Sequence, residues 1–231
     1  MKPYVICHMN ASVDGRILGS RWRPAENRMA GLFECLHEQL GGGSWLIGRV
    51  TGSEYAKANS YPDHTDQTYP RQPWFARRDA KAYGIALNAQ GKIAWGRSDI
   101  GGDPVVAVLT EEVSDAHLAG LRHDRVSYIF AGEGELDLGL ALEILNRELG
   151  IERLLLEGGG GSNGAFLRAG LIDEISLAIC PAVDGAKGAP GIFDSSEEDA
   201  GVAAPIRSMT LTSCEVLEGG AVWLRYRLQN R

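Results

Sequence analysis

Short apolar runs alternate with longer amphipathic stretches along most of the chain. The runs are rich in β-branched residues and end in turn residues, a pattern typical of buried strands. They occupy Tyr4 to Met9, Trp45 to Ile47, Tyr83 to Leu87, Val105 to Leu109, Val126 to Ala131, Leu154 to Leu156 and Glu174 to Cys180.

The amphipathic stretches predict the helices between these strands. From Ala25 to Leu40, apolar residues recur three or four positions apart, and the glycines at 41–43 should end that helix. Further helices are expected at Glu54 to Ala58, Ser114 to Leu121, Leu138 to Leu149 and Ala165 to Leu171. Asn59 to Arg78 has no clear period, which predicts a long loop, either a substrate lid or ordinary surface.

The C-terminal end of the chain carries a hairpin signature. Two long strand candidates, Ser208 to Leu217 and Ala221 to Leu228, are separated by Glu218-Gly219-Gly220. We therefore expect one domain over residues 1–231, an α/β fold with a mostly parallel sheet flanked by helices and ending in an antiparallel hairpin.

Composition narrows the class of partner. Hydrophobic residues make up 44% of the 231 residues, and the formal net charge is −7. A nucleic acid or an acidic membrane surface would require a concentrated basic face, so we expect neither, and a small molecule fits better. The four cysteines are scattered without CxxC spacing, and the sequence has neither a leader-like start nor a long apolar span, which favours the cytoplasm.

A run of four glycines marks the strongest candidate site. Residues 154–168 are LLLEGGGGSNGAFLR, an apolar strand end followed by Glu157, the glycines, Ser162, Asn163 and a helix. Glycines at such a turn let backbone N–H groups approach a phosphate, which the helix N-terminus also attracts. The spacing matches neither GxGxxG nor a Walker motif. The alternative is a flexible surface loop.

Three motifs at compatible spacing extend this picture over nearly the whole chain. HMNASVDGRI lies near the N-terminus, WLIGRVTGSEY follows, and LLLEGGGGSNGAFLRAGLIDEISLAICP ends at Pro181. In this order they resemble the reductase domain of riboflavin biosynthesis, which has the three-layer dihydrofolate-reductase-like fold. The resemblance implies hydride transfer from NADPH to C1′ of a 5-amino-6-(ribosylamino)pyrimidine 5′-phosphate, giving the ribitylamino form, without a metal.

The resemblance also assigns residues to the cofactor. Gly48, Arg49 and Thr51 match a turn that meets the adenosine side of NADPH, where a guanidinium suits the 2′-phosphate. Arg49 alone could equally be a solvated surface arginine. Gly158, Gly159, Gly160, Gly161, Ser162 and Asn163 would take the pyrophosphate and the nicotinamide ribose. Ala131 and Gly132 are placed in the same groove, although a plain strand end explains them nearly as well.

Substrate contact is assigned by the same resemblance to the N-terminal turn. Asn10, Ser12 and Asp14 match the SxDG turn, for which ordinary Asx-turn geometry is the alternative. Glu157 is the second catalytic candidate beside Asp14. A carboxylate next to a glycine run that favours a phosphate is repelled electrostatically, so its presence indicates a polar contact, for example with the substrate. Its alternative is a salt bridge with Arg153 or Arg168.

Two further reductase and binding hypotheses remain open. The segment from Trp22 to Glu26 resembles dihydrofolate reductase proper, in which a helix carboxylate serves pterin protonation; Glu26 would take that role, or would only stabilise the helix N-terminus. The chain could thus reduce dihydrofolate or a related heterocycle, or could be a nucleotide-binding protein without turnover.

Neither HxE nor PCxxC occurs, so no deaminase domain is expected. The family resemblance and the apolar C-terminal hairpin predict a homodimer.

Overall fold

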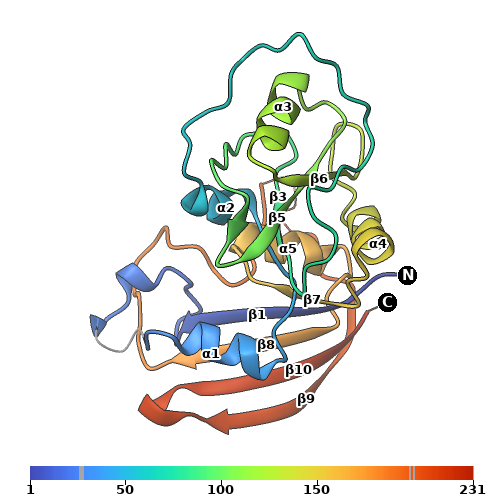
Figure 1. Cartoon of the computed structure of the whole chain (residues 1–231). Helices are drawn as coiled ribbons and strands as arrows, with labels where there is room; N and C mark the ends of the chain where they lie inside the picture. Colours follow the sequence, from blue (N-terminus) through green and yellow to red (C-terminus); the bar gives the residue numbers. More distant parts are fainter. Residues whose placement is uncertain (26–28, 198, 200, 231) are drawn as a thin grey trace. The chain divides into compact units, whose positions relative to one another are not determined.

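The computed structural model describes residues 1–25, 29–197, 199 and 201–230 (Figure 1). The chain forms two compact units, the first comprising residues 1–3 and 43–154 and the second residues 4–42 and 155–231. Strand β7 (Arg153–Leu156) carries the chain from one unit into the other. The single domain inferred from the sequence stays a prediction.

A parallel sheet forms the centre of the first unit. Its strands are β2 (Trp45–Ile47), β3 (Gly84–Leu87), β5 (Asp103–Leu109) and β6 (Ser127–Phe130), with the short β4 (Asp99–Ile100) antiparallel to the start of β5. The residues from Val105 to Leu109 are completely buried. Because both faces of β5 are covered, its sequence is continuously apolar instead of alternating.

Three helices accompany this sheet, α2 (Arg49–Tyr55), α3 (Asp115–His123) and α4 (Leu138–Leu149). The side chains of Ser114 and Asp137 accept backbone N–H groups at the starts of α3 and α4, as N-caps do. Helix α2 begins at Arg49 and not at Glu54 as expected, because the extended backbone of Gly48 provides the N-cap position.

The long loop after α2 is fastened to the same unit. Trp74 exchanges two backbone hydrogen bonds with Tyr128 of β6, at 2.9 and 2.8 Å. Arg71 pairs with Asp115, and the Tyr61 hydroxyl donates to Asp124 at 2.7 Å. Packing against α3 and β6 thus supplies the order that the sequence pattern does not predict.

The second unit is built on a mixed sheet in the order β1-β8-β10-β9. Strands β1 (Tyr4–Ser12) and β8 (Glu174–Cys180) are parallel, with Ser12 opposite Cys180. Strands β10 (Val222–Asn230) and β9 (Ile206–Val216) continue it as the antiparallel hairpin, and β9 forms its outer edge (Figure 1). The expected hairpin is confirmed, and its strands are longer than the predicted ones.

Two helices and two 3-10 turns accompany the sheet among the described residues of the second unit. The helices are α1 (Leu32–Gln39) and α5 (Gly160–Arg168), and the turns lie at Gly19–Arg21 and Glu218–Gly220. Helix α1 is shorter than predicted because Gly31, at φ 78°, is a left-handed N-cap. The glycines at 41–43 all have positive φ and end this segment as expected.

Buried His8 joins α1 to the sheet of the second unit. Its ring stacks on Phe33 with 4.5 Å between centroids. The Phe33 carbonyl oxygen can only accept, so His8 Nε2 carries the hydrogen and donates to it at 3.1 Å. In the neutral ring Nδ1 then accepts the Ser176 hydroxyl at 3.2 Å, and the Trp223 indole N–H donates to Ser176 Oγ at 2.8 Å. Every polar group of this buried chain is satisfied.

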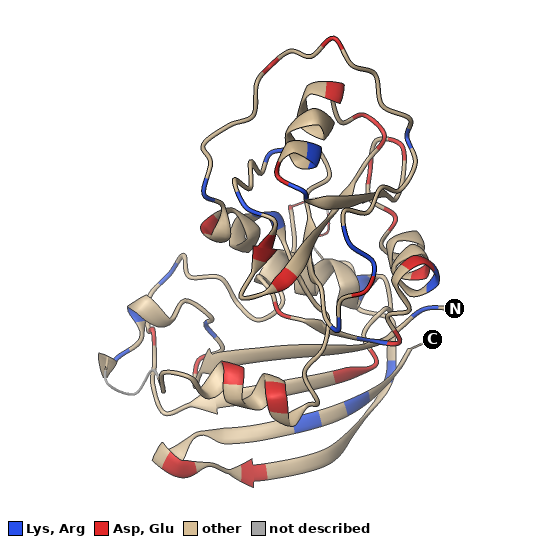
Figure 2. Cartoon of the chain, in the orientation of Figure 1, with Lys and Arg blue, Asp and Glu red and all other residues tan. Residues whose placement is uncertain are grey.

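Charges of both signs are distributed over the two units. Both units carry acidic and basic residues, and neither sign forms a long run in the sequence (Figure 2). Within the described residues, no helix combines the length and the apolar character needed to cross a bilayer.

Candidate functional site

The predicted site residues lie in both units. The first unit holds Gly48, Arg49, Thr51, Ala131 and Gly132, and the second holds Asn10, Ser12, Asp14, Glu157 and the segment 158–163. Glu26, assigned above to proton transfer, lies outside the described residues.

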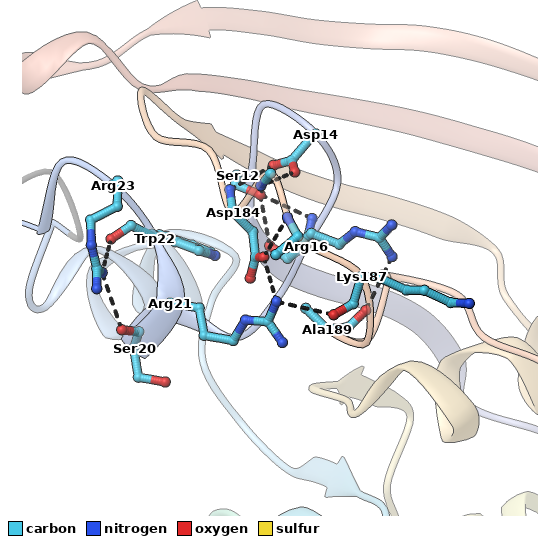
Figure 3. Close-up of polar contacts among 12 residues, drawn as sticks. Ser12, Asp14, Arg16, Ser20, Arg21, Trp22, Arg23, Asp184, Lys187 and Ala189 are labelled. Carbon is cyan, nitrogen blue, oxygen red and sulfur yellow. Dashed lines mark hydrogen bonds and ion pairs between the residues drawn. The ribbon is translucent and has the colours of Figure 1, made fainter.

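Asp14 follows the carboxyl end of β1 and is held by three hydrogen bonds (Figure 3). Its Oδ1 accepts the Ser12 hydroxyl at 2.6 Å and the Asp184 N–H at 3.1 Å, and its Oδ2 accepts the Gly185 N–H at 2.9 Å. The Ser12 hydroxyl first, and then these backbone N–H groups, lower the pKa of Asp14 well below its usual range. Asp14 is therefore ionised at neutral pH, a state suited to positioning and not to donating a proton.

The segment 184–191 was missed by the sequence analysis. Asp184, whose side chain is fully buried, pairs with Arg21 at 2.8 Å, and Arg16 donates to the Ala189 carbonyl at 3.1 Å (Figure 3). Because β1 and β8 are parallel, their carboxyl ends share one edge, where ligands bind in open α/β sheets. A signal was present, since Val-Asp-Gly occurs both at 13–15 and at 183–185.

The glycine run divides into packing positions and an open position. Helix α5 begins at Gly160, with Gly159 as N-cap, earlier than the predicted start at Ala165. A Cβ on Gly160 would lie 2.3 Å from the Gly191 carbonyl oxygen, and one on Gly164 would lie 1.8 Å from the Asp194 oxygen. A Cβ on Gly161 would meet nothing within 4 Å. Part of the run thus permits residues 191–194 to pack on α5, while Gly161 is exposed.

Asn163 belongs to the packed side of the run. It is completely buried, and its amide donates to the Ile192 carbonyl at 2.9 Å. Its Oδ1 is buried without a hydrogen-bond partner among the described residues, as is Oδ1 of Asn10 in the same unit. Asp184 Oδ2 and Asn230 Oδ1 of this unit are buried in the same way, so an acceptor of this kind does not by itself mark a ligand site.

Glu157 has a partner that the sequence analysis did not consider. His37, in the last turn of α1, places Nδ1 2.7 Å from Glu157 Oε1, and the two side chains are 16% and 9% exposed. Arg168, one predicted partner, instead pairs with Asp199 at 2.8 Å and donates to the Asp194 carbonyl. The ion-pair alternative for Glu157 is therefore realised through a histidine, 120 residues away in sequence.

In the first unit, Gly48, Arg49 and Thr51 form the start of α2. Gly48 is buried and extended, Arg49 is exposed, and the first turn contains no acidic residue. An exposed guanidinium at this position leaves its forked N–H groups accessible to a phosphate.

Ala131 and Gly132 have a complete structural explanation. Gly132 has φ 110°, and a Cβ there would lie 1.9 Å from the Glu135 carbonyl oxygen. The Ala131 carbonyl accepts the Asp137 N–H at 3.0 Å. This turn leads into α4, so a tight strand end accounts for both residues.

The arrangement of strands and helices defines a class of protein. A pyrimidine reductase-like protein of Corynebacterium diphtheriae aligns over 99% of this chain and 93% of its own, with a TM-score of 0.71 and 15% identity. The riboflavin biosynthesis reductase Rib7 of Saccharomyces cerevisiae aligns over 99% and 90%, with a TM-score of 0.61 and 18% identity. RibD of Acinetobacter baumannii aligns over 99% of this chain and 58% of its own, with a TM-score of 0.63 and 19% identity. The predicted dihydrofolate-reductase-like α/β class is confirmed.

Sequence relationships identify the family within this class. The family model of the RibD C-terminal domain matches residues 97–223. The chain therefore belongs to the RibD C-terminal domain family. A curated relative of Methanothermobacter thermautotrophicus, 2,5-diamino-6-ribosylamino-4(3H)-pyrimidinone 5′-phosphate reductase, is 38% identical over 96 residues, which are 42% of this chain and 44% of the relative. The chain thus matches less than half of that relative's length.

Proposed function

We propose that the protein is an NADPH-dependent reductase that converts a 5-amino-6-(ribosylamino)pyrimidine 5′-phosphate into its ribitylamino form. The family membership and the related reductase support this assignment. The observation that carries it is the start of α5 in the second unit, where the Gly161 backbone is exposed and the Glu157 carboxylate directly precedes the glycine run.

The residues fit a dinucleotide in chemical character. Gly161 leaves room for a pyrophosphate at the start of α5, whose first turn contains no acidic side chain. Gly158, Gly159, Gly160, Ser162 and Asn163 shape this turn in the second unit. For the first unit, the family resemblance is the basis for proposing that Gly48, Arg49 and Thr51 contact the adenosine phosphate. When bound, NADPH supplies the hydride. Ala131 and Gly132 are the weakest part of this assignment, because the strand end explains them.

The protein's own residues have distinct tasks in this proposal. Ser12 and ionised Asp14 fasten the turn after β1 to the segment 184–191. Asn10 and Glu157 offer acceptors to the ribose hydroxyls or the ring. Opening of the ribose breaks the C1′–O4′ bond, and O4′ then takes both electrons of that bond and a proton. Reduction at C1′ completes the ribityl chain, so each turnover consumes one hydride and one proton.

NADPH oxidation in the presence of each substrate tests the function. We expect turnover with the ribosylaminopyrimidine phosphate and little with dihydrofolate. Turnover with dihydrofolate alone would favour the alternative reductase. Tight NADPH binding without turnover of either compound would favour the nucleotide-binding alternative.

We further propose a cytoplasmic homodimer formed through the C-terminal hairpin. Strand β9 lies at the edge of its sheet, and Met209, Leu211 and Val216 are 47%, 51% and 80% exposed. Trp223 of the same hairpin is buried within its own unit, where its indole N–H donates to Ser176, so it does not contribute to this exposed surface.

A further inference from the structure

The contact between His37 and Glu157 has the geometry of a pair that shares a proton. A distance of 2.7 Å between Nδ1 and Oε1 is at the short end of the range for charge-assisted hydrogen bonds. Nitrogen and oxygen lone pairs repel at this distance unless a hydrogen lies between them. The pair therefore holds one proton, whether the formal charges reside on an imidazolium and a carboxylate or both groups are neutral.

This pair is much more buried than the other contact between a histidine and a carboxylate among the described residues. His64 and Asp66 lie 3.0 Å apart, but their side chains are 85% and 99% exposed. Water screens such a pair, so its contribution is small. The side chains of His37 and Glu157 are mostly shielded from water, which strengthens their interaction.

The position of the pair also differs from that of His8, the other histidine of the second unit. His8 is completely buried, and both of its ring nitrogens bond to the protein's own groups. Glu157 directly precedes the glycine run and retains some exposure. His8 thus anchors α1, whereas the His37 pair lies at the start of the proposed site.

We propose that His37 is a positioning residue: it orients the Glu157 carboxylate and supplies it with a proton. The inference rests on the proposed function. As the C1′–O4′ bond breaks, O4′ keeps the electron pair and takes the proton held by the pair. Reduction at C1′, for which bound NADPH would supply the hydride, completes the ribityl chain, and solvent restores the proton to His37 and Glu157.

Three variants and one control test this role. His37→Ala removes the partner, His37→Asn keeps a short N–H donor near the place of Nδ1, and Glu157→Gln removes the carboxylate. His64→Asn, in the exposed pair, is the control. We expect His37→Ala to lower kcat at least tenfold with the NADPH Kd changed less than twofold, His37→Asn to recover part of that loss, and the control to match the unmodified protein.

The pH profile of kcat distinguishes positioning from simple stabilisation. A pair that must be protonated loses activity as the pH rises, so this alkaline limb should move to lower pH in His37→Asn, where the carboxyl group no longer shares its proton with an imidazole. A lowered Tm in His37→Ala, with kcat and its pH profile unchanged, would overturn the proposal.

A measurement independent of turnover separates this inference from the proposed function. The ¹³C resonance of the Glu157 carboxyl group, identified by its loss in Glu157→Gln, should shift its titration midpoint in His37→Asn. An unchanged midpoint would overturn the role of His37. Absence of NADPH oxidation by the unmodified protein would instead refute the proposed reductase, and with it the proton transfer to O4′.

Discussion

At the scale of single residues, Arg49 offers the sharpest test of cofactor choice. Its guanidinium is exposed at the first position of α2, where it could bond to the 2′-phosphate that distinguishes NADPH from NADH. A charge-assisted hydrogen bond contributes about 1.5–3 kcal/mol, which corresponds to roughly 10- to 150-fold in affinity. Arg49→Ala should therefore remove most of the preference for NADPH.

Titration calorimetry with both cofactors measures this preference. The unmodified protein should bind NADPH more tightly, and Arg49→Ala should weaken NADPH while leaving NADH nearly unaffected. Arg147→Ala, which changes an exposed arginine on α4 outside the predicted cofactor residues, serves as the control. Equal affinities in the unmodified protein would contradict the assignment of Arg49.

The family resemblance led to Asp14, and the carboxylate beside the glycine run led to Glu157, but the partners of these two residues could not be predicted. Nothing local in the sequence joins Glu157 to His37, because the contact depends on how α1 packs. Asp184 was similarly hidden, although it repeats the Val-Asp-Gly turn of Asp14. The chain supplies such turns in many places, and only the parallel pairing of β1 with β8 brings these two together.

At the scale of elements, the packing of residues 191–194 on α5 depends on Gly164. A Cβ at this position would lie 1.8 Å from a backbone oxygen of Asp194, which cannot move without the segment that contains it. Overpacking of this kind costs about 1–3 kcal/mol. Gly164→Ala should lower the free energy of unfolding by about that amount in a denaturant titration.

Gly161→Ala is the matched control in the same helix. Its Cβ would enter open space, and alanine is favoured over glycine in a helix by up to about 1 kcal/mol. We expect unchanged or increased stability, together with weaker NADPH binding because the methyl group occupies the proposed pyrophosphate position. Equal destabilisation by both substitutions would argue against the packing explanation.

Buried His8, which connects α1 to its sheet, predicts that the stability of the protein depends on pH. Burial lowers the pKa of His8 from 6.5 to about 4. The unfolded chain therefore binds more protons between these values, so stability is fully present above about pH 6.5 and decreases as the pH falls toward 4. A shift of this size corresponds to about 3 kcal/mol. Burial also lowers the pKa of His117 to about 4, which adds to the loss in the same range.

Denaturant titrations from pH 7 to pH 4.5 can isolate the share of His8. His8→Met fills a similar volume and cannot titrate, so this variant should be less stable at pH 7, where it lacks two hydrogen bonds, but should lose less stability on acidification. His64→Asn should leave the curve unchanged. An equal pH dependence in His8→Met and the unmodified protein would refute the contribution of His8.

Element positions were predictable to the extent that local patterns determine them. The strand at Trp45–Ile47 and the helix at Leu138–Leu149 agree with the prediction at both ends, because apolar runs and caps mark them. Helix α1 was predicted too long, since the left-handed Gly31 interrupts a continuing apolar repeat. The loop after α2 has order that comes from α3 and β6, and no local period could indicate it.

At the scale of the whole molecule, the exposed edge of β9 predicts association with a second copy. Exposed strand edges bind other strands unless charge, bulges or a partner protect them. Stable interfaces bury about 1,200–2,000 Å² in total, and an edge strand of 11 residues with exposed Met209 and Leu211 can contribute to such an area. Light scattering at micromolar concentration should therefore give twice the chain mass of 24.9 kDa.

Leu211→Lys should shift the protein toward the monomer, because it places a charge in an apolar contact. Leu140→Lys, at a 38% exposed position on α4, should not change the mass. A monomer mass for the unmodified protein would refute the dimer, and a dimer unaffected by Leu211→Lys would place the interface elsewhere.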